Sequence, residues 1–259
     1  MSGYSKLSLE GKCALVFGGT SGLGKSIAVG LAEAGADVVP VSRRAEEVRR
    51  TAEEIRALGK KTFEITADVT VRDQIQAVIN RMIGEMGRID ILVNSAGTTM
   101  RVPSFEVTED QWDRVLDINL KGTWNCCQMV GRVMREQVYG RIVNIASLTS
   151  FLSAHEVAAY AASKGGVAQV TRCLAAEWAK YNITVNAIAP GVFETALNTK
   201  LINEPGRKAS ILSHTPMKRF GQVEEIKGAA ILLASDAASF ITGAFIPVDG
   251  GFLAQGIGE

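Results

Sequence analysis

Short apolar runs bounded by glycine alternate with amphipathic stretches along the whole chain. The apolar runs predict strands at residues 12–17, 37–42, 62–66, 89–94, 141–147, 183–189 and 244–248. The stretches between them predict helices at residues 22–34, 46–58, 71–86, 109–136, 158–181 and 223–235. Strands that are apolar throughout and alternate with helices are typical of a parallel sheet covered on both faces. We therefore expect an α/β fold, a doubly wound parallel sheet of about seven strands flanked by helices.

No linker or internal repeat interrupts this pattern, so residues 1–259 are expected to form a single domain. Pro40 is a departure inside the second predicted strand, because proline removes one donor from the ladder. The strand at 62–66 is the weakest, and the segment from about 192 to 221 is rich in loops.

The charge balance and the hydropathy pattern exclude several classes of protein. Lys and Arg number 28 against 27 Asp and Glu, a net charge of +1, which argues against a nucleic-acid surface. No apolar run reaches the roughly 18 residues of a membrane span. The first ten residues lack the apolar centre of a secretory signal. We expect a cytoplasmic protein that binds neither membranes nor nucleic acid.

The cysteines and histidines do not form a metal motif. No C-x-x-C spacing occurs among the cysteines, Cys13, Cys126, Cys127 and Cys173, and core thiols in a reducing compartment are the simplest interpretation. The two histidines, His155 and His214, belong to no zinc-type cluster. No metal cofactor is expected.

The first predicted strand runs into a glycine-rich turn, GGTSGLG at residues 18–24, where a helix begins. Glycines let the backbone approach a pyrophosphate, and the helix N-terminus offers free N–H groups and a partial positive charge. A plain strand-to-helix turn is the alternative, but the first turn of an alternating α/β pattern is the context that favours a dinucleotide. The candidate cofactor-binding residues in this turn are Gly18, Thr20, Ser21, Gly22, Leu23 and Gly24.

The spacing G-x-x-x-G-x-G through Gly18, Gly22 and Gly24 resembles that of the short-chain dehydrogenase/reductase family. In that family the turn usually reads T-G-x-x-x-G-x-G, and Phe17 stands here in place of the Thr. We expect this to remove a local hydrogen bond rather than the site. The resemblance covers essentially the whole chain, down to VDGG at residues 248–251. It implies a single-domain Rossmann-type fold and hydride transfer between a nicotinamide cofactor and the carbonyl or hydroxyl carbon of a small substrate.

The end of the second predicted strand carries the cofactor preference. An enzyme that uses NAD has an acid there to bind the ribose hydroxyls, whereas this chain has Ser42, Arg43 and Arg44. A hydroxyl followed by guanidinium groups suits the 2′-phosphate of NADP. Solvated charges leading a helix are the alternative interpretation, and Ser21 occupies the family's second basic position. NADP(H) is the expected cofactor, with NAD(H) left open.

Three further segments match family motifs in order after successive strands. Asp68 and Val69 match the pair that contacts the adenine. The segment NSAG at 94–97 matches N-N-A-G, with Ser95 replacing one Asn. PGVFET at 190–195 matches P-G-x-x-x-T, which faces the nicotinamide. The additional cofactor-binding residues that the resemblance implies are Asn94, Ala96, Gly97, Pro190, Gly191, Val192 and Thr195.

Tyr160 and Lys164 have the Y-x-x-x-K spacing, which puts both side chains on one face of a helix. A free tyrosine has a pKa near about 10, and a fixed cation nearby favours the phenolate and brings that pKa toward neutrality. Alone, this spacing also arises as a surface pair. Ser147 ends an apolar strand, where doubly wound sheets keep their active sites, and its hydroxyl can bind a substrate oxygen as charge develops.

The family resemblance implies a catalytic tetrad of Asn119, Ser147, Tyr160 and Lys164. In it Tyr160 is the acid/base, Ser147 the oxyanion partner and Lys164 the group that lowers the tyrosine pKa. Lys164 also holds the nicotinamide ribose. Asn119 anchors a proton relay through water, although a plain amide inside a helix is the alternative.

The candidate substrate residues are Arg101, Thr149, His155 and Phe193, and a substrate lid is expected at about 192–221. Arg101, AEW at 176–178 and MKRFG at 217–221 give the chain a resemblance to the gluconate 5-dehydrogenase branch, which acts on sugar acids. There Arg101 would bind a carboxylate through two hydrogen bonds. An exposed loop arginine and a loop histidine are the alternatives for Arg101 and His155.

Two rival functions remain. A 3-oxoacyl-acyl-carrier-protein reductase has the same tetrad and a different pocket. A non-catalytic NADP-binding sensor belongs to another class, and it has no reason to keep Ser147, Tyr160 and Lys164 together. Members of the family are commonly homotetramers joined through the long fourth and fifth helices and the C-terminal strand, which is the expectation here.

Overall fold

The computed structural model describes residues 4–196, 198–199 and 203–255, and in them seven parallel strands form one sheet in the order β3-β2-β1-β4-β5-β6-β7. The strands are β1 (Cys13–Phe17), β2 (Asp37–Ser42), β3 (Ile65–Thr66), β4 (Ile91–Asn94), β5 (Gly140–Ile145), β6 (Ile183–Pro190) and β7 (Phe245–Val248). The strand order reverses between β1 and β4, which is the topological switch point where such sheets bind ligands. The expected α/β fold is confirmed.

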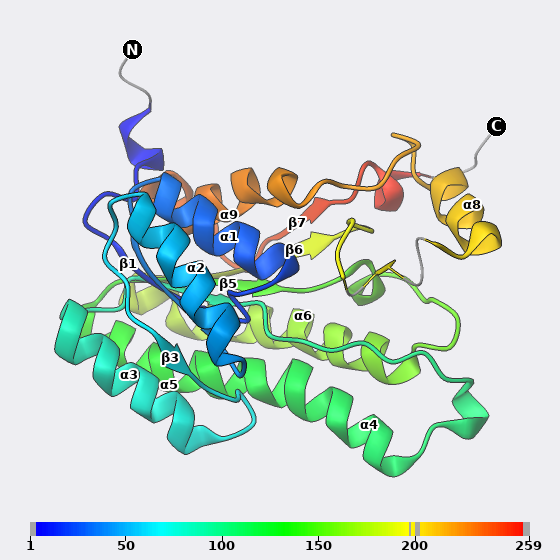
Figure 1. The fold of residues 1–259 in the computed structure, drawn as a ribbon, viewed down its shortest axis with the longest axis horizontal. Helices are drawn as coiled ribbons and strands as arrows, with labels where there is room; N and C mark the ends of the chain where they lie inside the picture. Colours follow the sequence, from blue (N-terminus) through cyan, green and yellow to red (C-terminus); the bar gives the residue numbers. More distant parts are fainter. Residues whose placement is uncertain (1–3, 197, 200–202, 256–259) are drawn as a thin grey trace.

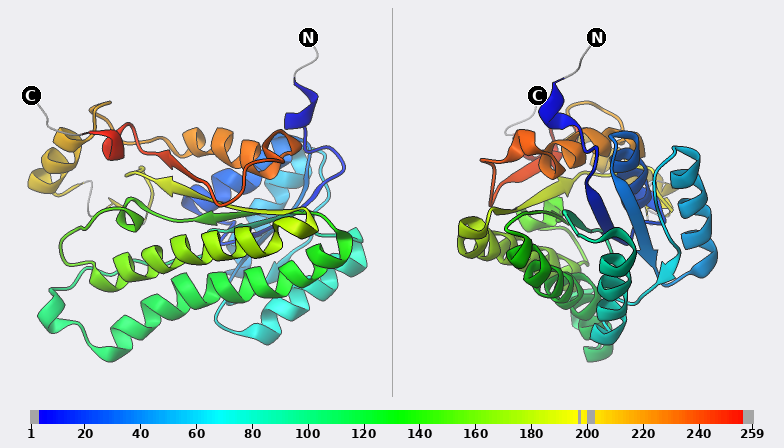
Figure 2. Two further views of the ribbon diagram at one scale, coloured as in Figure 1. Left: turned by 180° about the vertical axis from the view of Figure 1, so that it is seen from behind. Right: turned by 90° about the vertical axis from the view of Figure 1, so that its left-hand side faces the viewer.

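Helices cover both faces of the sheet (Figures 1 and 2). One layer contains α1 (Gly22–Glu33), α2 (Ala45–Ala57) and α9 (Lys227–Ala234), and the other contains α3 (Arg72–Met86), α5 (Gly122–Gln137) and α6 (Ala158–Trp178). All five residues of β1 are buried. Leu15 and Phe17 pack into the core under α3, α5 and α6, whereas Val16 packs into the core under α1 and α9. This two-sided burial explains why the strands are apolar throughout.

The helix predicted over 109–136 is interrupted. It consists of α4 (Glu109–Leu116), a π-helical segment at Asp117–Lys121, and α5. Thr108 begins α4 with a capping box shared with Gln111. Single π-helical turns inside α-helices often mark functional sites, and this one contains Asn119.

The third strand and the loop-rich segment differ from what the sequence predicted. β3 has two residues, and this explains how β2 accommodates Pro40. The Val38 N–H donates to the Lys61 carbonyl, on the side of β2 that faces β3. The nitrogen of Pro40, two residues later, faces the same side at a level where β3 has not yet begun, because β3 starts at Ile65. The segment 192–221 contains a helix that sequence reasoning missed, α8 (Pro205–His214). Residues 197 and 200–202 of the expected lid, and residues 1–3, lie outside the described residues.

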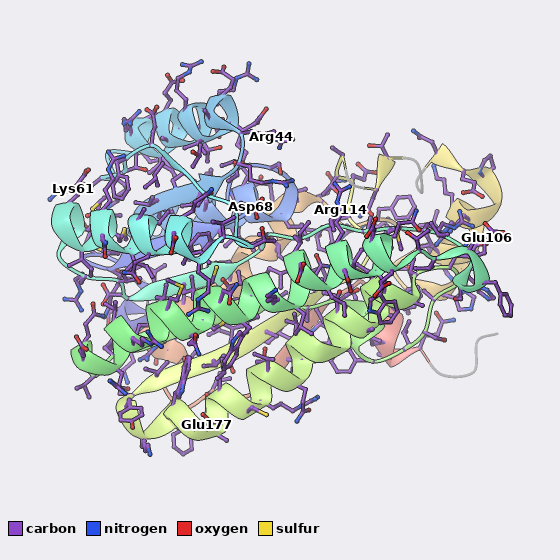
Figure 3. All side chains as sticks on the ribbon, turned by 90° about the horizontal axis from the view of Figure 1, so that it is seen from below. Arg44, Lys61, Asp68, Glu106, Arg114 and Glu177 are labelled. Carbon is purple, nitrogen blue, oxygen red and sulfur yellow. The ribbon has the colours of Figure 1, made fainter. Side chains whose placement is uncertain are left out.

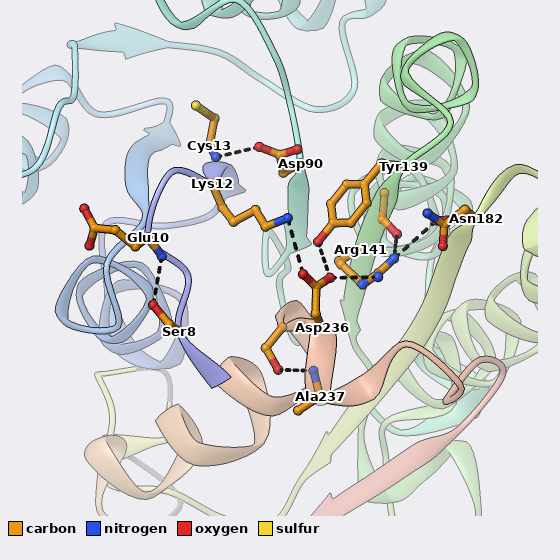
Figure 4. Close-up of polar contacts among 12 residues, drawn as sticks. Ser8, Glu10, Lys12, Cys13, Asp90, Tyr139, Arg141, Asn182, Asp236 and Ala237 are labelled. Carbon is orange, nitrogen blue, oxygen red and sulfur yellow. Dashed lines mark hydrogen bonds and ion pairs between the residues drawn. The ribbon is translucent and has the colours of Figure 1, made fainter. Parts of the chain in front are cut away.

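A polar cluster joins β1 and β5 at the amino end of the sheet (Figure 4). The Asp236 carboxylate accepts hydrogen bonds from Tyr139 Oη at 2.8 Å and Arg141 Nη2 at 3.0 Å, and Lys12 Nζ lies 3.5 Å away. Lys12 Nζ and the Arg141 guanidinium lie 4.0 and 4.4 Å from the centre of the Tyr139 ring. The cluster lies at the amino ends of these strands, opposite the carboxyl ends where a ligand would bind, so its role is to stabilise the fold.

Three of the cysteines, Cys13, Cys126 and Cys127, are buried as expected, whereas Cys173 is exposed on α6. No helix in the described part of the chain is both long and apolar enough to cross a membrane. Within the same residues, no cluster of three or more His, Cys, Asp or Glu side chains is arranged to hold a metal.

Candidate active site

A cavity of about 620 Å³ opens at the carboxyl ends of the strands, on both sides of the switch point. Its size lies in the range of small-molecule and cofactor sites. The turns that follow successive strands line it, with residues 18, 20–24, 42–44, 68–69, 95–99, 145–149 and 190–192. The motifs that the sequence singled out therefore meet in one place.

The glycine turn is packed so closely that side chains do not fit. Gly18 has a φ of +76°, and a Cβ atom there would collide with the backbone nitrogen of Ala96. A Cβ on Gly24 would collide with the Gly18 carbonyl. The turn after β1 therefore lies directly against the turn after β4, with the start of α1 opening into the cavity.

This turn presents donors that the protein itself does not use. Thr20 is 2% exposed and its Oγ1 has no hydrogen-bond partner among the described residues. Ser21 is the N-cap of α1 and makes no side-chain capping bond. The Thr195 methyl lies 3.5 Å from where a Cβ on Gly22 would be, so the segment after β6 approaches this turn closely. Unused hydroxyls at a helix N-terminus fit an anionic ligand such as a dinucleotide pyrophosphate.

The residues that follow β2 and β3 line the same cavity, and Arg44 and Asp68 can be found in Figure 3 where these strands end. Arg43 Nη1 lies 3.5 Å from Asp68 Oδ2, and the Arg44 N–H donates to Ser42 Oγ at 3.4 Å. Burial disfavours the Asp68 carboxylate, but bonds from the N–H and hydroxyl of Thr70, together with Arg43, outweigh burial and lower its pKa.

Ser147, Tyr160 and Lys164 all line the cavity. Ser147 follows β5 in an extended conformation, and Tyr160 lies in the first turn of α6 with Lys164 one turn later. The Ser147 hydroxyl interacts with Tyr160 closely enough to affect the pKa of the phenol. Lys164 Nζ donates to the Ile145 carbonyl at 2.7 Å and lies 5.9 Å from the centre of the Tyr160 ring.

Burial governs the proton affinities of this pair. It raises the pKa of Tyr160, and the interaction with the Ser147 hydroxyl opposes that shift. Burial lowers the pKa of Lys164 from its ordinary value of 10.5 to about 8. The sequence predicted that Lys164 lowers the tyrosine pKa. In this structure the contribution that lowers the Tyr160 pKa comes from Ser147, and Lys164 Nζ donates to the Ile145 carbonyl.

Asn119 is fully buried, and both polar atoms of its side-chain amide are hydrogen-bonded within the protein. Oδ1 accepts the Thr98 N–H at 2.8 Å, and Nδ2 donates to the Thr98 carbonyl at 2.9 Å and to Ser163 Oγ at 3.0 Å. Its own carbonyl accepts the Thr123 hydroxyl at 2.7 Å. The amide braces the turn after β4 against α6.

Only one of the four candidate substrate residues lines the cavity. Thr149 lines the cavity, and its Oγ1 is buried without a partner among the described residues. Phe193 does not line it, because this residue is 2% exposed and packs against Gly221 in the core. His155 is exposed and lies outside the lining. Arg101 also lies outside the lining, with its guanidinium directed to acidic side chains.

Sequence reasoning missed several residues that line the cavity, Arg114 of α4, Leu152, Val157, Phe252, and Arg207 and Ile211 of α8. A signal for α8 was present, because Pro205 stands at the first helical position, where proline is favoured. For the other residues the chain carries no local signal, since they reach the cavity through tertiary packing. Arg114 projects from the helix layer on the side seen in Figure 3.

Comparison with known proteins agrees with this geometry. A family model described as "Enoyl-(Acyl carrier protein) reductase", from the short-chain dehydrogenases, matches residues 18–253. The chain belongs to the short-chain dehydrogenase/reductase family. It is 43% identical to a 2-dehydro-3-deoxy-D-gluconate 5-dehydrogenase from Pseudoalteromonas atlantica over 96% of this chain and 99% of the relative. A 3-oxoacyl-[acyl-carrier-protein] reductase from Thermotoga maritima is 40% identical over 95% of this chain and 100% of the relative.

Among solved structures, a gluconate 5-dehydrogenase from Burkholderia cenocepacia, in complex with NADP and tartrate, superposes with a TM-score of 0.94. It is 39% identical, and the match covers 97% of this chain and 99% of that chain. Family membership makes this short-chain dehydrogenase/reductase an NAD(P)-dependent oxidoreductase that acts on CH–OH or C=O groups.

Proposed function

We propose that this short-chain dehydrogenase/reductase interconverts a secondary alcohol and a ketone on a sugar acid or a similar small polar keto compound, with NADP(H) as cofactor. The observation that carries the proposal is that Ser147, Tyr160 and Lys164 all line one cavity, with Tyr160 and Lys164 one helical turn apart on α6. Two hydroxyl groups held together on the lining can both reach one substrate oxygen.

The cofactor would lie across the switch point. The glycine turn and Thr20 would hold the pyrophosphate, and Asp68, Val69, Ala96 and Gly97 the adenosine half. Asn94, expected to join them, does not line the cavity, because its buried amide donates to Asn144 Oδ1 at 2.8 Å. Pro190, Gly191, Val192 and Thr195 would hold the nicotinamide half. Ser42, Arg43 and Arg44 would bind the 2′-phosphate, since the residues at and directly after the end of β2 are a serine and two arginines rather than an acid. When bound, the nicotinamide supplies or accepts the hydride.

The remaining chemistry belongs to side chains of this chain. In the reductive direction Tyr160 donates its phenolic proton to the substrate oxygen, and in the oxidative direction its phenolate removes the hydroxyl proton. Ser147 donates a hydrogen bond to that oxygen as charge develops. Lys164 would bind the ribose hydroxyls of the cofactor, and its positive charge would favour the phenolate of Tyr160. Asn119 keeps the turn at residues 97–98 in position and anchors the proton relay.

The substrate class rests on the relatives, whose printed names include 2-dehydro-3-deoxy-D-gluconate and gluconate 5-dehydrogenases. One observation favours a second candidate. Leu152, Val157, Ile211 and Phe252 make one part of the lining apolar, as a 3-oxoacyl chain requires. A 3-oxoacyl-acyl-carrier-protein reductase is therefore the alternative.

We also propose a cytoplasmic homotetramer of single-domain subunits, each with a substrate lid at residues 192–221. Trp112 and Trp124 are 36% and 37% exposed on α4 and α5, and Phe240 is 103% exposed just before β7. Exposed aromatic side chains on these elements suit contacts between subunits. Light scattering coupled to size-exclusion chromatography measures the oligomeric state directly.

The test of function is steady-state reduction with NADPH and NADH of 5-keto-gluconate, a simple diketone and a 3-oxoacyl thioester. Turnover of the keto acid with NADPH that is lost in Tyr160→Phe, with cofactor binding retained, supports the proposal. Turnover of the thioester alone favours the alternative. Tight NADPH binding without turnover of any carbonyl compound would identify a sensor instead.

A further inference from the structure

The arginine that sequence reasoning assigned to the substrate is neutralised by its neighbours. Arg101 Nε donates to Glu156 Oε2 at 2.6 Å, and Nη1 donates to Glu204 Oε2 at 3.3 Å. Two carboxylates around one guanidinium leave no net positive charge to attract an anionic substrate. Arg101 also lies outside the cavity lining.

Arg207 reaches the cavity from the lid helix α8. Ile211, one turn later, also lines the cavity, and His214, a further turn on, packs against Phe252, another lining residue, with ring centres 6.1 Å apart. The three positions 207, 211 and 214 form one face of a helix, so α8 presents this face to the cavity. Arg207 is the charged member of that face, and it is partly buried.

The Arg207 guanidinium has no ion pair among the described residues. The nearest acid along the chain, Glu204, is directed to Arg101 instead. Ile211, one turn after Arg207 on the same face of α8, and Phe252, which contacts His214 of that face, are apolar members of the lining. A part-buried guanidinium on the wall of a cavity, with no ion pair among the described residues, is a strong site for a carboxylate, because both desolvation and the planar donor fork favour pairing.

We propose that Arg207 binds the carboxylate of the substrate and thereby makes this short-chain dehydrogenase/reductase selective for keto acids, an inference that rests on the proposed function. The ion pairs among Arg101, Glu156 and Glu204 join residue 101, the loop before α6 and the start of α8. These pairs position α8 so that Arg207 faces the cavity. Arg101 is thus a positioning residue.

The experiment compares kcat and KM for a keto sugar acid and for its uncharged keto-sugar counterpart, with NADPH. In Arg207→Ala the KM for the acid rises about 10- to 100-fold, the range for a lost charge-assisted hydrogen bond. The KM values for the neutral ketone and for NADPH stay within twofold. Arg207→Lys keeps part of the effect, and Lys208→Ala, next to it on the exposed face of α8, is the matched control.

Three results would overturn the assignment. An equal loss with both substrates points to a structural role of α8, and a raised KM for NADPH makes Arg207 a cofactor phosphate contact. A charge-selective loss in Arg101→Ala or Arg114→Ala, with none in Arg207→Ala, moves the carboxylate site elsewhere.

Failure of the proposed function can be distinguished from failure of the Arg207 assignment. If the wild-type enzyme reduces only the neutral ketone, the sugar-acid substrate is wrong, and Arg207 is then tested through inhibition of that reaction by tartrate. Inhibition of the wild type that Arg207→Ala relieves at least tenfold supports a carboxylate site at Arg207. Equal inhibition of both proteins, or of neither, rejects it.

Discussion

Asn119 and Thr98 form a two-way hydrogen-bond pair between a buried side-chain amide and a backbone peptide, with distances of 2.8 and 2.9 Å. The same Nδ2 donates to Ser163 Oγ, and Ser163 donates to the carbonyl of Tyr160 at 2.7 Å. The turn after β4 and the first turn of α6 are therefore joined through one amide that projects from the π-helical segment.

Replacing Asn119 by Ala should loosen this joint. The Thr98 N–H and carbonyl lose their partners, which should lower the free energy of unfolding by on the order of 2 kcal/mol. The kcat should fall as well, because Tyr160 is no longer held through Ser163. Urea denaturation and steady-state kinetics measure the two effects, with the exposed Asn80→Ala on α3 as control. Unchanged stability in Asn119→Ala would contradict the assigned role.

Ser147→Ala should move the pH dependence of alcohol oxidation to higher pH. The Ser147 hydroxyl opposes the rise in the Tyr160 pKa that burial causes, so without this hydroxyl the pKa is higher still. The phenolate fraction at any given pH falls, and the alkaline rise of kcat/KM shifts upward. A pH–rate profile checks this, with Ser153→Ala, another cavity-lining serine, for comparison. A lower maximum at an unchanged midpoint would show that Ser147 acts on the substrate alone.

Lys164→Met should change how the free energy of unfolding depends on pH, because Lys164 is a buried ammonium group. Burial lowers the Lys164 pKa to about 8 from 10.5, so between these values the unfolded chain binds the extra proton. The free energy of unfolding of the wild type therefore gains on the order of 3 kcal/mol from this group as pH rises through that window. The variant lacks this gain.

The measurement is the difference in free energy of unfolding between wild type and Lys164→Met at pH 7 and at pH 10, without cofactor. The wild type should gain relative to the variant at the higher pH. Lys208→Met, on an exposed face of α8, is the matched control. A difference that stays constant with pH would mean that Lys164 is hydrated in solution.

Arg43→Ala and Arg44→Ala should each weaken NADPH more than NADH. Both residues line the cavity where β2 ends, and a 2′-phosphate gains charge-assisted hydrogen bonds from them. The KM for NADPH should rise about tenfold or more per residue, with little change for NADH. Arg49→Ala, an exposed α2 arginine paired with Glu46 and Glu53, is the control. Parallel losses with both cofactors would assign these arginines to the fold instead.

Asp236→Asn should destabilise the amino end of the sheet. The change removes ion pairs with Lys12 and with Arg141, whose side chain is 2% exposed, and the free energy of unfolding should drop by on the order of 2 kcal/mol. Glu64→Gln, which breaks only the exposed pair with Arg56, should cost less than about 1 kcal/mol.

The effect of Asp236→Asn should also depend on pH. Burial disfavours the Asp236 carboxylate, but Tyr139, Lys12 and Arg141 outweigh it and lower the pKa. The stabilisation is therefore fully present above the unfolded value of 3.8 and disappears as pH falls through the lower folded pKa. Thermal unfolding at pH 7 and near pH 3 should show a smaller gap between variant and wild type in acid.

The sequence predicted the sheet well because strand burial leaves a local record. Both faces of β1 are covered, so every residue in it is apolar, and glycine punctuates the ends. The motif positions were predictable for the same reason, since Y-x-x-x-K and G-x-x-x-G-x-G are local spacings. The chemical roles of Asn119, Ser147, Tyr160 and Lys164 stay predictions until the variants are measured.

The chain by itself determined the parallel sheet, the glycine turn at the switch point and the Tyr160–Lys164 face of α6. Tertiary structure decided what depends on partners distant in sequence. Arg101 is neutralised by residues 55 and 103 positions away, and Phe193 is buried against Gly221. The lowered pKa of Lys164 likewise follows from burial. Charge pairing and desolvation depend on what surrounds a side chain in space, and that environment exists only after the chain has folded.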